Sequence, residues 1–151
     1  MSELLDQFLL EGRELIQQAT DDLLALERHP GDAARLDGAF RAVHTLKGSV
    51  ALFDLVPMER ALHAAEDLLD AVRDGRRAAG QNVMDALLDL IGASEGWIEE
   101  IARTGGLPED APQHGRALEG RYARPWMAMR CRARRCPRRH PGPRGPNGCR
   151  G

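Results

Sequence analysis

Apolar residues recur at intervals of three, four or seven positions through most of the first hundred residues. This spacing places side chains on one face of an α-helix and is typical of amphipathic helices that pack together. A first helix is predicted over residues 4–26, and His29, Pro30 and Gly31 end it, because proline disfavours helical geometry in the residue before it. Its predicted inner face comprises Leu5, Phe8, Leu15, Ala19, Leu23 and Leu26.

A second helix is predicted to begin after Asp32, since an aspartate side chain can cap the first backbone N–H groups of a helix. Asp54 and Pro57 mark its junction with a third helix, because proline is tolerated in a first helical turn. The predicted apolar stripe of the second helix comprises Leu36, Phe40, Val43 and Val50, with Leu46 and Phe53 beside it. That of the third comprises Met58, Leu62, Ala65, Leu69 and Val72.

Asp74, Gly75 and Gly80 are predicted to separate the third helix from a fourth, residues 82–103. The predicted inner face of this last helix comprises Met84, Leu87, Ile91, Ile98 and Ile101. No segment shows the alternating apolar and polar pattern of a β-strand. Four amphipathic helices with short connections predict an all-α fold, an antiparallel four-helix bundle.

Residues 43–49 (VHTLKGS) carry the first candidate chemistry. His44 follows the inward Val43 and shares a polar row with Gly48, so we expect its imidazole to face solvent. Glycine within a helix costs about 1 kcal/mol relative to alanine, and its use at Gly48 would let another protein approach His44 closely. Lys47 is the only lysine among 20 arginines, and its ammonium is expected near any anion attached to His44.

A second polar row on the predicted third helix includes His63, Glu66 and Asp70. If this row lies against the second helix, Glu66 or His63 can reach His44. A carboxylate that accepts a hydrogen bond from one imidazole nitrogen leaves the other nitrogen with an outward lone pair. That is the arrangement a phosphoryl acceptor needs, while a metal ion and acid groups would come from a partner protein.

The motif formed by His44, Lys47, Gly48 and Ser49, followed by Phe53, resembles the signature of histidine-containing phosphotransfer (HPt) domains. It is most similar to the N-terminal phosphotransfer domain of bacterial chemotaxis histidine kinases of the CheA family. The resemblance covers about residues 1–104, including the HAAEDLLDAVRDG stretch. It implies an HPt-type bundle whose histidine accepts a phosphoryl group from a kinase's ATP-binding domain and passes it to an aspartate of a response-regulator receiver domain.

Carried over by position, the resemblance implies that His44 is the phosphorylation site, with Lys47 and Gly48 as its motif partners. It likewise implies that Glu66 and His63 belong to a hydrogen-bonding network on the neighbouring helix. One departure is Asp54, where the family usually has glycine after the phenylalanine. Its position at a helix end affects the local turn more than the chemistry.

Charge is divided unevenly along the 151 residues, although the formal net charge is only −2. Residues 1–111 carry 10 basic and 22 acidic groups, a net −12, whereas residues 112–151 carry 11 basic groups and one acidic group, a net +10. We therefore predict a phosphotransfer domain at 1–106, then a linker and a tail rich in Arg, Pro, Gly and Cys at 107–151. Residues 130–151 contain no Leu, Ile or Val, which predicts disorder and also fits an out-of-frame reading of a GC-rich gene.

The three cysteines, Cys131, Cys136 and Cys149, all lie in this tail, so the acidic part fits a reducing cytoplasm without disulfides. Their spacing, with His140, does not match the tight pairs of zinc sites, and we predict no metal site. The arginines favour at most sequence-independent binding to nucleic acid, which we do not expect as the main role. No apolar run approaches the roughly 20 residues that span a bilayer, and the acidic start is unlike a secretion signal.

Two classes of function stay open: a phosphocarrier, and a helical binding module whose basic tail binds nucleic acid or acidic partners. We predict no enzyme and no cofactor in this chain, because it has neither a glycine-rich phosphate loop nor a magnesium-binding carboxylate motif. ATP and Mg²⁺ are expected on partner proteins. The dimerisation, ATP-binding and coupling domains of a chemotaxis kinase are missing from the sequence, which fits a truncated or frameshifted kinase or a stand-alone phosphotransfer protein.

Overall fold

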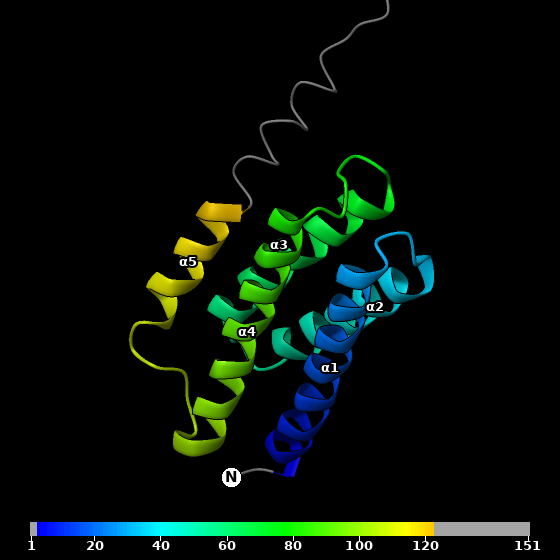
Figure 1. Ribbon diagram of the computed structural model, residues 1–151. Helices are drawn as coiled ribbons and strands as arrows, with labels where there is room; N and C mark the ends of the chain where they lie inside the picture. The colour runs from blue at the N-terminus through cyan, green and yellow to red at the C-terminus, as the bar shows by residue number, and fades with distance from the viewer. Residues whose placement is uncertain (1–2, 123–151) are drawn as a thin grey trace, which may run out of the picture.

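The computed structural model describes residues 3–122, and the regular secondary structure in this part of the chain is all α-helix (Figure 1). The elements are α1 Glu3–Arg28, α2 Ala33–Ala51, α3 Val56–Arg73, α4 Gln81–Thr104 and α5 Ala111–Tyr122. The predicted all-α fold is therefore confirmed. The predicted disorder of the tail and the zinc and nucleic-acid interpretations of residues 130–151 lie outside the described residues.

Helices α1 to α4 form an antiparallel bundle in which each helix packs against two neighbours (Figure 1). Helix α1 contacts α2 and α4, and α3 contacts the same two helices from the opposite corner. Burying each large aliphatic side chain contributes roughly 1.5–3 kcal/mol, which makes this core the main source of stability. The largest side chains sealed in it include Leu23, Leu26, Leu46, Met58, Leu62, Leu69, Leu87, Leu90, Ile91 and Ile98.

The ends of the helices follow the local chemistry of the sequence. Asp32 caps α2 as predicted, with its carboxylate accepting hydrogen bonds from the backbone N–H groups of Ala34 and Arg35 at 3.1 and 3.2 Å. Pro57 occupies the first turn of α3. Asp54 has a φ of 55°, a left-handed conformation that glycine adopts without strain and that aspartate tolerates. The glycine that the resemblance implies at this position would adopt this backbone conformation without strain.

Helix α5 lies in the segment for which the sequence predicted a linker, and it packs against α3 and α4. Ala111 and Leu118, seven residues apart, are almost completely buried. At Gly115, helix α5 approaches α3 so closely that a Cβ atom on this residue would lie 3.0 Å from backbone atoms of Pro57. The packed part of the chain therefore continues past residue 106. Ala111, Gly115 and Leu118 are enough to pack this short helix against α3. None of the helices within residues 3–122 is long and apolar enough to cross a membrane.

Candidate functional site

His44 projects from α2 on the side that faces α3. Its side chain is 63% exposed, whereas the neighbouring Val43 and Leu46 are buried in the core. The predicted solvent exposure of this imidazole is therefore confirmed. Its Nδ1 atom lies 3.2 Å from Oε1 of Glu66, a residue of α3. The predicted polar row of the third helix thus does lie against the second helix, and it is Glu66 that reaches the ring.

Glu66 connects His44 with Lys47. While Oε1 faces the imidazole, Oε2 forms an ion pair with the Lys47 ammonium, with 2.7 Å between Nζ and Oε2. Oε2 is buried, so the Lys47 ammonium beside it compensates its negative charge. The sequence predicted this ammonium near an anion on His44, and in this structure it lies on the carboxylate that holds the imidazole.

The ionisation of Glu66 follows from these contacts. Burial on its own would raise the pKa of the carboxyl group, but hydrogen bonding and charge from Lys47, and then from His44, lower the pKa below its ordinary value of 4.5. Glu66 is therefore a carboxylate at neutral pH and accepts a hydrogen bond from Nδ1–H of His44. This tautomer leaves Nε2 with its lone pair as an available nucleophile, on a side chain that is largely exposed.

His63, the other candidate on α3, lies elsewhere. Its side chain is 58% exposed, and its Nε2 atom lies 3.5 Å from Oδ2 of Asp67, one turn further along the same helix. The structure therefore brings His44, Lys47 and Glu66 together and leaves His63 beside Asp67. Its predicted place in the network of His44 has no contact to support it in the described residues.

Gly48 lies one turn after His44 on α2 and is exposed. A Cβ atom built there would have no other atom within 4 Å, so no internal packing requires a glycine. The position leaves a low surface beside the imidazole. An approaching protein can therefore come closer to His44 than any side chain at this position would allow.

Two further residues contact this site and were not predicted as part of it. The ring of Phe40 is nearly parallel to that of His44, at 10° with 6.2 Å between centroids, and the guanidinium of Arg73 lies 4.4 Å from the Phe40 centroid. The four-residue spacing of Phe40 and His44 was a usable signal, but Phe40 was assigned to the buried stripe and is only partly buried. Nothing local in the sequence points to Arg73.

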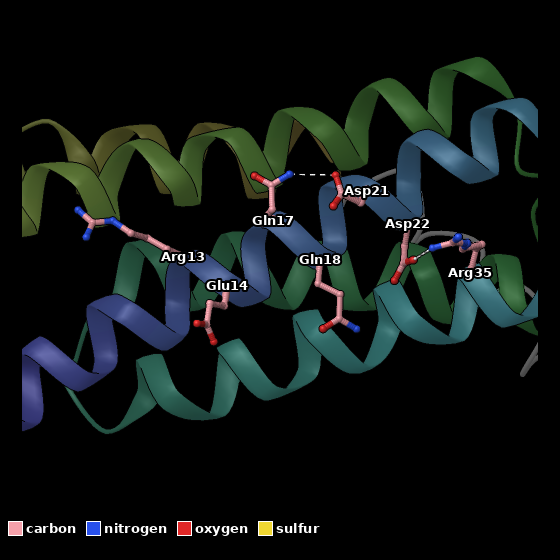
Figure 2. A pocket seen from close by; sticks show the side chains of 7 residues that line it. All are labelled: Arg13, Glu14, Gln17, Gln18, Asp21, Asp22 and Arg35. Carbon is pink, nitrogen blue, oxygen red and sulfur yellow. Dashed lines mark hydrogen bonds and ion pairs between the residues drawn. The ribbon is translucent and has the colours of Figure 1, made fainter.

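The pocket in Figure 2 is lined by residues of α1 together with Arg35 of α2, and His44 is not among its lining residues. It is an open depression of about 580 Å³, and two pairs of its polar side chains contact each other, Gln17 with Asp21 and Arg35 with Asp22. No group of three or more potential metal ligands occurs in residues 3–122.

Comparison with known proteins agrees with this arrangement. The chain belongs to the Hpt domain family, whose sequence model matches residues 3–97. It is 34% identical over 110 residues to the chemotaxis protein CheA of Halobacterium salinarum and 36% identical over 99 residues to that of Borreliella burgdorferi. These matches cover 73% and 66% of this chain but only 16% and 11% of the relatives.

Solved structures give the same result. The phosphorylated P1 domain of CheA3 from R. sphaeroides, in complex with CheY6, aligns with 82% of this chain and 98% of its own, at 28% identity and a TM-score of 0.71. The CheA phosphotransferase domain from Thermotoga maritima aligns with 68% of this chain and 99% of its own, at 29% identity and a TM-score of 0.64. The chain thus carries a chemotaxis-type histidine phosphotransfer domain, a phosphocarrier in two-component signalling.

Proposed function

We propose that His44 accepts a phosphoryl group from ATP held by the catalytic domain of a histidine kinase and passes it to an aspartate of a response-regulator receiver domain. The observation that carries the proposal is the 3.2 Å contact between His44 Nδ1 and the Glu66 carboxylate on an otherwise exposed ring. The likeness to a phosphorylated P1 domain in complex with CheY6 supports a receiver domain as the second partner.

Each step of the proposed transfer forms one bond to phosphorus and breaks another. The Nε2 lone pair forms a bond to the γ-phosphorus while the bond from that phosphorus to the bridging oxygen breaks, and its electron pair leaves with ADP. Nδ1 keeps its proton, so the phosphorylated ring is cationic, and the Glu66 carboxylate stabilises it. In the second step an aspartate oxygen attacks the phosphorus, and the electron pair of the N–P bond returns to Nε2.

ATP and Mg²⁺ belong, in this proposal, to the partner proteins, because the stabilisation of a transferring phosphoryl group needs cations that Lys47 alone does not supply. Lys47 is already paired with Glu66. Its role is therefore to hold the carboxylate ionised and in place. The similarity to CheA proteins supports a role in a chemotaxis pathway. Location in a reducing cytoplasm stays a prediction, based on the absence of cysteines from the acidic part of the sequence.

The test uses a chemotaxis kinase that lacks its own phosphotransfer domain, with ATP labelled at the γ-phosphate. Wild-type protein should acquire label that survives base and is lost in acid. His44→Gln should acquire none, whereas His29→Gln, which alters another exposed histidine, should be labelled like wild type. Equal labelling of His44→Gln and wild type would contradict the proposal and favour a helical binding module.

A further inference from the structure

Helix α3 contacts the His44 row of α2 at two separate points. Glu66 meets His44 itself, and Arg73, two turns later on α3, meets Phe40, one turn earlier on α2. Because the two helices run antiparallel, both contacts lie along the same α2–α3 interface. The two contacts are also linked, since the Phe40 ring lies beside the His44 imidazole.

The geometry of the Phe40 contact is that of an offset parallel ring pair. The centroids are 6.2 Å apart and the planes differ by 10°, within the range where aromatic rings attract one another. The Arg73 guanidinium, 4.4 Å from the Phe40 centroid, is within cation–π distance. Ion pairs from Arg73 to Asp37 at 3.6 Å and to Asp70 at 3.8 Å hold the guanidinium over the ring.

The imidazole needs such a support because it is largely exposed. With 63% of its side chain open to solvent, it is held by one hydrogen bond of 3.2 Å through Nδ1. A single hydrogen bond fixes one atom but still lets the ring swing about that atom. A contact along the ring face restricts the plane, and with it the direction in which Nε2 points.

We propose that Phe40 and Arg73 are positioning residues for phosphoryl transfer: Arg73 fixes the Phe40 ring, and Phe40 holds the His44 imidazole in the plane that keeps Nδ1 on Glu66. This inference rests on the proposed function of His44. It adds a requirement, namely that the reactivity of the histidine depends on an aromatic side chain one helical turn before it.

The experiment measures the His44 ring directly and its reactivity separately. Nitrogen-15 chemical shifts of the His44 ring at pH 8 report the fraction with the proton on Nδ1. Phosphoramidate, a small phosphoryl donor without a docking surface, reports the reactivity of Nε2 as the initial rate of phosphohistidine formation. Both are compared in wild type, Phe40→Leu, Phe40→Tyr and Arg73→Gln, with Phe53→Leu as the matched control.

Phe40→Leu should lower the phosphoramidate rate by about three- to tenfold, the size expected for a lost aromatic pair, and should shift protons from Nδ1 to Nε2. Phe40→Tyr should restore both, and Arg73→Gln should lower the rate by about twofold. Phe53 packs against Phe8 with 4.6 Å between centroids, so Phe53→Leu loses a comparable ring contact while retaining both wild-type readings.

The inference would be overturned if Phe40→Leu kept the wild-type tautomer and the wild-type phosphoramidate rate. It would also be overturned if Phe53→Leu lowered this rate and shifted the tautomer as much as Phe40→Leu does. Failure of the proposed function has a different signature. In that case the wild-type protein itself would acquire no label on His44 from either phosphoramidate or a kinase, whatever the ring shifts of the Phe40 variants.

Discussion

Nδ1 of His44 lies 3.2 Å from Oε1 of Glu66, although the two residues belong to different helices and are 22 positions apart. The nitrogen that we propose as the nucleophile is therefore defined only once α2 and α3 are packed. On an isolated α2 the imidazole would have no carboxylate to select its tautomer. If His44 is the phosphoryl acceptor, its reactivity depends on bundle folding through this contact.

The contribution of Glu66 to stability should depend on pH. Because the folded-state pKa of Glu66 is lowered, its ionised form stabilises the fold above about pH 4.5, and this contribution is lost as pH falls through the folded pKa. Glu66→Gln lacks the titrating group. The difference in free energy of unfolding between wild type and Glu66→Gln, from urea denaturation, should therefore be larger at pH 7 than at pH 4. A difference that is constant with pH would contradict it.

Removal of the Lys47 charge should destabilise the fold, because the buried carboxylate oxygen of Glu66 would lose its neighbouring positive charge. Lys47→Met should lower the free energy of unfolding by about 1–3 kcal/mol, because Glu66 Oε2 loses its compensating charge. The double variant with Glu66→Gln should lose less than the sum of the single variants, with a coupling of about 0.5–3 kcal/mol. Strict additivity in urea denaturation would show that the pair is not coupled.

Gly48→Ala separates stability from docking. An alanine meets no other atom at this position and should stabilise the helix by about 1 kcal/mol. The added methyl group should nevertheless slow phosphoryl exchange with kinase and receiver while leaving the phosphoramidate rate unchanged. Gly92→Ala on α4, equally open, is the matched control and should gain stability without slower exchange. Unchanged exchange in Gly48→Ala would show that close approach there is not required.

The packing of α5 against α3 can be tested by substitution of Gly115. Because a Cβ atom there would lie 3.0 Å from the backbone of Pro57, Gly115→Val should displace α5 and lower the free energy of unfolding by about 1–3 kcal/mol. Gly120→Val, on the same helix with open space around it, serves as the control for the helix propensity of valine. Equal urea midpoints for the two variants would place Gly115 outside a packed contact.

Sequence patterns predicted the parts of this structure that depend on local rules. Asp32 as a cap, the breaks between helices and the exposure of His44 all follow from neighbours within one or two turns. The pairing of Glu66 with His44 was predictable only on the condition that the third helix lies against the second. Periodicity does not specify that orientation, and it therefore left His63 as a second, weaker candidate beside Glu66.

What the sequence did not reveal depends on tertiary packing alone. Arg73 reaches Phe40 across the α2–α3 seam, and no spacing rule connects two residues 33 positions apart on different helices. Helix α5 was missed because its buried face is too small to produce a clear apolar stripe. In both cases weak local signals become definite only when a neighbouring helix supplies the other half of the contact.

The most direct test of the account is to locate the phosphorus atom on the protein. Wild-type protein with nitrogen-15 histidine is phosphorylated by a chemotaxis kinase and ATP, and coupling between nitrogen-15 and phosphorus-31 identifies the modified nitrogen. We expect phosphorus on Nε2 of His44, with Nδ1 still protonated and directed at Glu66. Phosphorus on Nδ1 of His44, or on another histidine such as His63, would contradict it.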